Sequence, residues 1–157
     1  MTGISITVSH EKIRAGALLD QLTGADPECG GVASFTGQVR LEPGLVALEL
    51  EHYPAVTENA LQAIAETATR QWSLHQAVIH HRVGRMEIGE TLVFVAATAP
   101  HRREALDAVG YMIDLLKTEA PFWKQVHTKD GSHWVEARDT DREAANYWTD
   151  QMTSEDA

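Results

Sequence analysis

Apolar and polar positions alternate along several short segments of the chain, and this spacing predicts β-strands. The clearest case is LVALELEHY, residues 45–53, in which Val46, Leu48 and Leu50 are expected to share one face of a sheet. Farther along, the Asp-Gly pair at residues 130–131 is a strong turn signal, so the segments on either side of it are expected to form a hairpin. The predicted strands are residues 4–8, 32–39, 45–53, 77–83, 91–99, 122–127 and 133–137.

A second pattern, with apolar residues three or four positions apart, predicts four helices. The first covers residues 11–22 and the last covers residues 141–148. Pro54 and Pro100 mark the starts of the two helices between them, and Pro121 enforces the end of the third helix. The apolar stripes of the second and third helices are Val56, Ala60, Leu61, Ile64 and Ala68, and Ala105, Val109, Met112, Ile113 and Leu116.

The predicted strands and helices do not alternate regularly along the chain, which favours an α+β fold over a doubly wound sheet. With 157 residues, the chain has the length of one ordinary domain. We assign that domain to residues 1–150 and expect residues 151–157 to form a frayed tail.

Charge and composition exclude several classes of protein. The formal net charge of −10 argues against a nucleic-acid-binding protein, because such proteins gain affinity by neutralising phosphates with Lys and Arg. A small anionic substrate is still compatible, since a local basic pocket can lie within an acidic surface. The single cysteine, Cys29, precludes an internal disulfide and a cysteine-based zinc site. With no secretory signal and no apolar run of membrane-spanning length, we expect a soluble, cytoplasmic protein.

The octapeptide KTEAPFWK, residues 117–124, carries a lysine at each end. The proline between them turns the chain, so the ammonium groups of Lys117 and Lys124 can converge on one pocket walled by Phe122 or Trp123. Desolvation and mutual repulsion there would lower a lysine pKa and make that lysine a usable acid, base or nucleophile. Alternatively, Lys117 is a cation favoured by the helix dipole and Lys124 is a solvated strand residue.

Two further segments contain basic residues in unusual positions. PHRREAL, residues 100–106, places His101, Arg102 and Arg103 in the first turn of a predicted helix, where the macrodipole disfavours cations. Such a turn either binds an anion, for which backbone N–H groups and cations cooperate, or is simply solvated. FTGQVR, residues 35–40, ends a strand with an arginine that can bind a phosphate or carboxylate, although an arginine in this position is usually solvated.

The histidines and the cysteine do not predict a metal site. His80 and His81 are neighbours on a predicted strand and point to opposite faces, so they cannot easily join His75 around one ion. Cys29 could act as a nucleophile, but a lone cysteine in a turn is more often incidental. We therefore expect no metal.

Six segments occur in one order along the chain: FTGQVR, ELEHY, HRVGRMEIGE, APHRREAL, LKTEAPFWK and DGSHWVEAR. In this combination the chain closely resembles the large, catalytic subunit of molybdopterin synthase, from about residue 4 to about residue 148. The most specific part is HR at a helix start, followed one helix later by K-x-x-x-P-x-W-K. The resemblance favours the functional interpretation of both basic clusters.

The resemblance implies an α+β fold, an α/β hammerhead with an additional small antiparallel β-sheet. It also implies a sulfurtransferase of molybdenum cofactor biosynthesis. Such an enzyme transfers two sulfurs from the C-terminal Gly-Gly thiocarboxylate of a small ubiquitin-like carrier subunit to cyclic pyranopterin monophosphate, giving the dithiolene of molybdopterin. The implied assembly is a homodimer of catalytic subunits within a heterotetramer, without a cofactor.

Matching the motifs residue by residue, the resemblance assigns Lys117 and Lys124 as catalytic residues. It implies that His101, Arg102 and Arg138 hold the substrate phosphate, with Arg138 contributed across the dimer to the neighbouring site. Whether a lysine attacks the acyl carbon of the carrier or only stabilises oxyanions and shuttles protons stays open. The implied substrate-binding residues are Gln38, Val39, Arg40, His101, Arg102, Lys117, Lys124, Gln125, Val126 and Arg138.

Two other functions compete with this interpretation. One is a lysine enzyme that forms a Schiff base with a carbonyl substrate. The other is a non-catalytic module that only docks a ubiquitin-like protein, which would not need both lysines. The turn LEPG, residues 41–44, departs from many relatives and is not expected to add a polar substrate contact.

Overall fold

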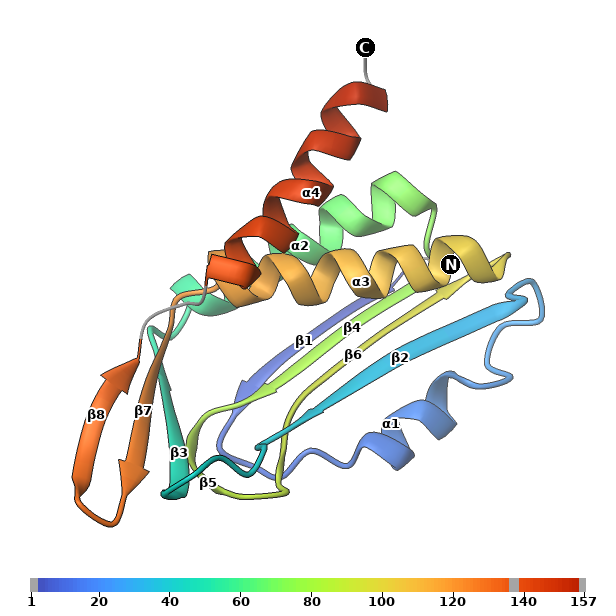
Figure 1. The fold of residues 1–157 in the computed structure, drawn as a ribbon. Helices are drawn as coiled ribbons and strands as arrows, with labels where there is room; N and C mark the ends of the chain where they lie inside the picture. The colour runs from blue at the N-terminus through green and yellow to red at the C-terminus, as the bar shows by residue number, and fades with distance from the viewer. Residues whose placement is uncertain (1–2, 136–138, 156–157) are drawn as a thin grey trace.

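The computed structural model describes residues 3–135 and 139–155 of the chain. Figure 1 shows a four-stranded sheet with helices on both faces and a second sheet at one of its ends. Along the chain, the elements are β1 (Gly3–Ser9), α1 (Ala15–Leu22), β2 (Gly31–Gln38), β3 (Leu45–His52), α2 (Val56–Trp72), β4 (Gln76–Arg82), β5 (Gly84–Glu87), β6 (Thr91–Ala99), α3 (Arg102–Glu119), β7 (Phe122–Thr128), β8 (Gly131–Val135) and α4 (Asp139–Glu155).

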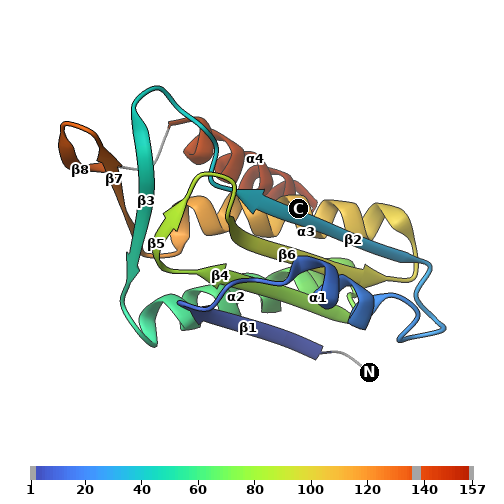
Figure 2. The same cartoon turned by 90° about the horizontal axis from the view of Figure 1, so that it is seen from below.

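The first sheet has the strand order β1-β4-β6-β2. β1 pairs with β4 in parallel, and the other neighbours are antiparallel. β6 is apolar on both faces because helices cover both faces of the sheet. Val93 and Val95 pack into the core beneath α2 and α3, whereas Phe94 and Ala96 pack against α1. Figure 2, seen from below, shows α1 alone on its side of this sheet.

The second sheet is antiparallel and has the order β5-β3-β7-β8. Its own small core contains Leu48 and Leu50 of β3 together with Val39, Val83 and Met86. The predicted hairpin around the Asp-Gly turn is confirmed, because β7 and β8 pair on either side of it. The architecture therefore confirms the α+β class with an additional antiparallel sheet.

α3 connects the two sheets. Its predicted apolar stripe is confirmed, since Ala105, Val109, Met112 and Leu116 are buried against the first sheet. Its C-terminal end lies beside β7, and its N-terminal end lies beside the start of β2 at the far end of the molecule (Figure 1). The two basic clusters of the sequence are therefore held at opposite ends of one helix.

Three local predictions were wrong. The first helix starts at Ala15 and not at residue 11, because the Ser9 hydroxyl accepts the Glu11 N–H at 3.2 Å and forms a turn there. Val46 does not share the buried face with its neighbours but is 40% exposed, because the β3–β7 pairing shifts register between Leu45 and Ala47. No strand was predicted between residues 83 and 91, but this segment contains β5, which pairs with β3.

The C-terminal helix is longer than predicted, because α4 continues to Glu155. The division into a domain at residues 1–150 and a frayed tail at 151–157 stays a prediction. No helix in the described ranges 3–135 and 139–155 combines the length and the apolar character needed to cross a bilayer.

Candidate active site

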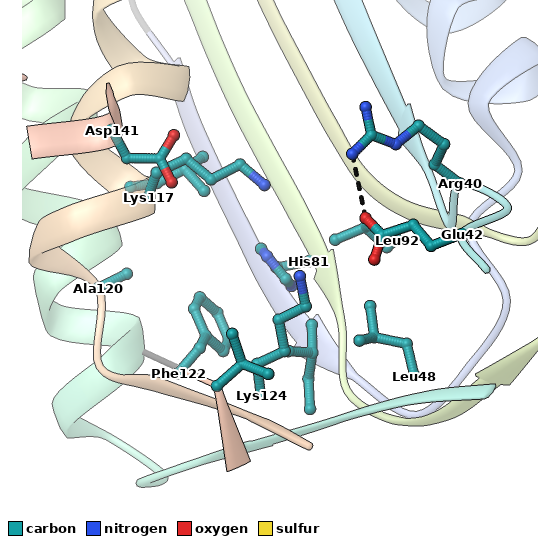
Figure 3. Close-up of a pocket in the computed structure, with 13 residues that line it drawn as sticks. Arg40, Glu42, Leu48, His81, Leu92, Lys117, Ala120, Phe122, Lys124 and Asp141 are labelled. Atoms are coloured by element: carbon teal, nitrogen blue, oxygen red, sulfur yellow. Dashed lines mark hydrogen bonds and ion pairs between the residues drawn. The ribbon is translucent and has the colours of Figure 1, made fainter. Parts of the chain in front are cut away.

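A pocket of about 430 Å³ opens where the C-terminal end of α3 meets the second sheet. Figure 3 shows cationic side chains entering it from three directions: Lys117 from α3, Lys124 from β7 and Arg40 from the turn after β2. Leucine, alanine and phenylalanine side chains form most of the remaining wall. The lining residues are Arg40, Glu42, Leu48, Leu50, His81, Leu92, Leu116, Lys117, Ala120, Phe122, Lys124, Val135 and Asp141.

Lys117 occupies the last turn of α3, one position after the buried Leu116. The residue is exposed to the open pocket, but protein atoms surround its ammonium group. This desolvation lowers the pKa of Lys117. The carboxylate of Asp141 on α4 acts in the opposite direction, and the Lys124 ammonium adds to the lowering. The predicted effect of desolvation and lysine repulsion is therefore confirmed in direction for Lys117.

Lys124 reaches the same pocket because of alternation along β7. Phe122 and Lys124 face the pocket, while Trp123 between them points to the other side of the sheet. Trp123 is 42% exposed and makes an edge contact with Tyr53, with ring centroids 4.3 Å apart. Of the two aromatic walls considered from the sequence, the structure selects Phe122.

Arg40 follows β2 and is fixed through its neighbour. The backbone N–H of Val39 donates to the Glu90 carbonyl at 2.9 Å, and the Val39 carbonyl accepts the Gly89 N–H at 2.8 Å. The Arg40 guanidinium pairs with the Glu42 carboxylate at 3.0 Å (Figure 3). The LEPG turn thus adds a polar group to the pocket, while the expectation that it makes no polar contact to the substrate stays a prediction.

His81 of β4 lies at the back of the pocket and is only 4% exposed. Its ring stacks on Phe122, with centroids 4.0 Å apart and planes inclined by 23°. Burial lowers the pKa of His81 to about 4, the Arg82 carbonyl opposes this shift, and the positive charges of Lys117 and His52 add to it. His81 is therefore neutral near pH 7.

Other predicted substrate residues lie outside this pocket. Arg102 begins α3, fifteen residues before Lys117, and a rise of 1.5 Å per residue separates the two by about 22 Å. His101, the N-cap residue of α3, lies beside Arg102, and both are exposed. Within this chain, the structure does not bring these two residues to the lysines.

The remaining predicted substrate residues have other surroundings. Gln38 is an exposed residue at the end of β2, and Val39 belongs to the core of the second sheet. Gln125 is the β7 residue opposite Glu49 and Trp134, and Val126 packs against the core that contains Val39. None of these four lines the pocket among the residues that the structure describes. Arg138 lies outside the described residues.

His80 and His81 point to opposite faces of β4, as predicted. His80 lines a second depression, beside α1, which His81 also borders. Among residues 3–135 and 139–155, one group has metal-ligating atoms within 4.8 Å of one another: Asp26, Cys29 and His75. In this group the Asp26 carboxylate and His75 Nδ1 are 2.6 Å apart, and His75 lowers the pKa of Asp26. The group lies on the loop before β2 and at the start of β4, and it lines no part of the lysine pocket.

Three ionisable pocket residues were not predicted to belong to the site: His81, Glu42 and Asp141. Alternation alone placed His81 and His80 on opposite faces but did not show which face meets the lysines. The signal that could have found His81 is its apolar context, because AVIHHRV puts a histidine at a position expected to be buried.

Comparison with known proteins identifies the family. Residues 8–119 match the family model described as MoaE protein. The chain belongs to the MoaE protein family. The molybdopterin synthase catalytic subunit of Escherichia coli strain K12 is 41% identical to this MoaE-family chain over 151 residues, which cover 94% of this chain and 100% of that protein.

Solved structures of the MoaE family share the fold. The molybdopterin biosynthesis MoaE protein from Burkholderia ambifaria MC40-6 superposes with a TM-score of 0.79 at 41% identity, covering 95% of this chain and 99% of that one. Molybdopterin synthase from Staphylococcus aureus gives a TM-score of 0.74 at 30% identity, covering 84% and 96%. The resemblance and the fold expected from the sequence motifs are thereby confirmed.

Proposed function

We propose that this MoaE-family chain is the catalytic subunit of a molybdopterin synthase, a sulfurtransferase of molybdenum cofactor biosynthesis. It transfers two sulfurs from the C-terminal thiocarboxylate of a small ubiquitin-like carrier to cyclic pyranopterin monophosphate. The observation that carries the proposal is the convergence of Lys117 and Lys124 on one pocket with Arg40. The reaction is placed in the cytoplasm, where reducing conditions suit a sulfur donor of this kind.

The pocket suits two anionic reactants. A thiocarboxylate and a cyclic phosphate both carry negative charge, and preorganised cations stabilise such charge best where water is partly excluded. In each transfer the sulfur replaces an oxygen substituent on the pterin side chain, so a carbon–sulfur bond forms there as a carbon–oxygen bond breaks. The displaced oxygen leaves as water or, where it belongs to the cyclic phosphate, stays on the phosphate as that ring opens. The carbon–sulfur bond of the thiocarboxylate breaks, and the carrier takes up an oxygen from water and ends as a carboxylate. Lys117, with its lowered pKa, is the better of the two lysines for moving a proton at neutral pH.

A homodimer would account for the basic residues that this pocket lacks. His101 and Arg102 are too far along α3 to reach the lysines of their own chain. They serve the substrate phosphate only if a neighbouring subunit presents them, as the sequence motifs already suggest for Arg138. We infer a dimer of catalytic subunits in which each subunit also binds one carrier.

A sulfur-transfer assay tests the proposal. Purified chain is mixed with cyclic pyranopterin monophosphate and a ubiquitin-like carrier that ends in a Gly-Gly thiocarboxylate, and dithiolene formation is measured. Product is expected with this carrier, and none with the same carrier ending in an ordinary carboxylate. Carrier binding without product would favour a docking module instead. A lysine adduct trapped by borohydride with the pterin would favour a Schiff-base enzyme.

A further inference from the structure

The roles proposed above leave His81 without a task, although it lines the pocket and is only 4% exposed. Three neighbours, Lys117, Lys124 and Arg40, only donate hydrogen bonds, and two others, Glu42 and Asp141, are carboxylates. Among the lining residues in the described part of the chain, His81 alone offers a neutral ring nitrogen that can accept a hydrogen bond. Such a group stands out in a pocket dominated by cations.

The hydrogen bonding of His81 determines its tautomer. Nδ1 lies 2.9 Å from the backbone carbonyl oxygen of Arg82. A carbonyl oxygen only accepts, so Nδ1 carries the proton and Nε2 of the neutral ring carries a lone pair. Within residues 3–135 and 139–155, Nε2 has no hydrogen-bond partner. It is an acceptor held ready for a donor that enters the pocket or moves within it.

The imidazole is also held in place. β4 runs between β1 and β6, and the Phe122 ring covers one face of the imidazole at 4.0 Å. Rotating the imidazole by half a turn would break the hydrogen bond from Nδ1 to the Arg82 carbonyl. The freed N–H would then lack this acceptor in a pocket dominated by cations. Figure 3 shows the imidazole and the ammonium ends of Lys117 and Lys124 directed into one space from β4, α3 and β7.

A neutral acceptor acts differently on a lysine than a carboxylate does. A carboxylate attracts an ammonium group but strongly favours its charged form, which raises the lysine pKa. An imidazole with a pKa of about 4 is a weak base and does not take the lysine proton at neutral pH. It can direct the N–H of an ammonium group while adding no negative charge. Of the two lysines, Lys117 is the one whose positive charge lowers the pKa of His81.

We propose that His81 is a positioning residue for Lys117: its unprotonated Nε2 accepts a hydrogen bond from the Lys117 ammonium group, directly or through one water, and aims that lysine at the sulfur donor. This inference rests on the proposed function, because it assigns a task within the same transfer. It places the lysine by geometry and leaves the charge of the ammonium group available to the anionic reactants.

Paired substitutions separate the acceptor from the bulk of the ring. His81→Asn keeps a donor near Nδ1 for the Arg82 carbonyl but removes the acceptor at Nε2. His81→Gln can place its amide oxygen near Nε2. His80→Asn, on the opposite face of β4, is the matched control. If His81→Asn does not fold, His81→Phe, which can keep the stack on Phe122, takes its place.

Two readouts are needed, namely kcat and KM of sulfur transfer and the NMR titration of the Lys117 ammonium group. For His81→Asn we expect kcat to fall about tenfold, the lower end of the loss for one hydrogen bond to a charged group, with KM nearly unchanged. The pKa of Lys117 should fall further, since the acceptor that stabilises its charged form is gone. His81→Gln should recover most of the rate, and His80→Asn should behave as the wild type.

A folded His81→Asn variant with normal kcat would overturn the inference. Equal losses in the Asn and Gln variants with an unchanged Lys117 titration would also overturn it, because they would indicate packing alone. A wild-type chain without sulfur transfer would count against the proposed function instead. The Lys117 titration would then still decide whether His81 holds that ammonium group.

Discussion

The two ends of α3 carry similar basic residues but differ in what surrounds them. At the C-terminal end, Lys117 lies in a pocket with Lys124, Arg40 and the buried His81. At the N-terminal end, His101 and Arg102 are exposed and line none of the depressions found in the described residues. The helix dipole favours the first cluster and disfavours the second. The comparison teaches that a basic cluster becomes a site only where other elements enclose it.

The largest expected effect is at the enclosed end. Lys117→Ala and Lys124→Ala should each reduce dithiolene formation by about 100-fold or more, the range of a lost acid–base or charge-stabilising group. Replacement of either lysine by Arg should fail as well, because guanidinium does not release its proton near neutral pH. Turnover is measured with the thiocarboxylated carrier.

Lys129→Ala, in the exposed turn between β7 and β8, is the matched control for both lysine substitutions. It removes the same charge, from the hairpin that also carries Lys124, at a residue that does not line the pocket. Near-normal turnover in a folded Lys117→Ala or Lys124→Ala chain would remove the catalytic assignment from that residue. An equal loss in Lys129→Ala would show that the hairpin charge as a whole matters.

Substitutions at the exposed N-terminal end of α3 should weaken substrate binding more than they slow the chemical step. Arg102→Ala is expected to weaken the affinity for the pterin precursor about 10- to 150-fold, the loss of one charge-assisted hydrogen bond of roughly 1.5–3 kcal/mol. Titration of the precursor measures this, with Arg103→Ala as the control, since Arg103 lies only 3.9 Å from Asp107 in its own helix. Unchanged affinity in Arg102→Ala would reject the phosphate role.

Mixed dimers test whether the two ends of α3 meet across an interface. In a heterodimer of one Arg102→Ala chain and one Lys117→Ala chain, sharing would give one site both defects and the other site neither. Activity should then rise above that of both parents, to about half of the wild type if sites act independently. The same design applies to Arg138→Ala. Verified heterodimers without any gain would indicate that each pocket is complete within one chain.

Most of the fold followed from the sequence because hydrophobic periodicity is a local signal. The stripe on α3 and the apolar run of β6 are determined by a few consecutive residues. The errors arose where a distant strand or a local turn decided the outcome. Val46 was misplaced because the register of β3 against β7 shifts beside it. β5 was missed because its four residues become a strand only by pairing with β3.

The site was predictable in its basic residues but not in its grouping. Lys117 and Lys124 are close in sequence, so a single turn could bring them together. His81 and Asp141 reach the same pocket from β4 and α4, and only the tertiary arrangement shows this. Arg102 was grouped with the lysines by motif, yet the length of α3 separates them in one chain.

The buried imidazole that distinguishes the enclosed end should make folding stability depend on pH. The pKa of His81 is about 4 in the folded chain, below its ordinary value of 6.5, so only the unfolded chain binds this proton between these values. The folding stability that depends on an unprotonated His81 is fully present above pH 6.5 and is lost as the pH falls toward 4. The change is roughly 3 kcal/mol of unfolding free energy.

Comparison with His81→Asn isolates this effect. The charged groups around the ring are Lys117 on α3, His52 on β3, Lys124 on β7 and Asp141 on α4, and they are present in both chains. Denaturant unfolding at pH 7 and pH 4.5 should therefore show the wild type losing more stability than the variant. Equal losses in the two chains would mean that His81 is not held neutral in the folded state.

The smallest expected effect concerns a carboxylate at the enclosed end. Glu42 pairs with Arg40 at 3.0 Å, but both side chains are largely exposed, and such pairs contribute about 0–1 kcal/mol. An anionic ligand must compete with Glu42 for the guanidinium. Glu42→Gln should therefore tighten binding of the pterin precursor by no more than about fivefold. The gain should shrink as salt screens the charges.

Asp20→Asn removes the same charge on α1, across the first sheet, and should leave affinity unchanged. Weaker binding in Glu42→Gln would show that Glu42 holds Arg40 in the orientation the ligand needs, and would make the LEPG turn part of the binding site.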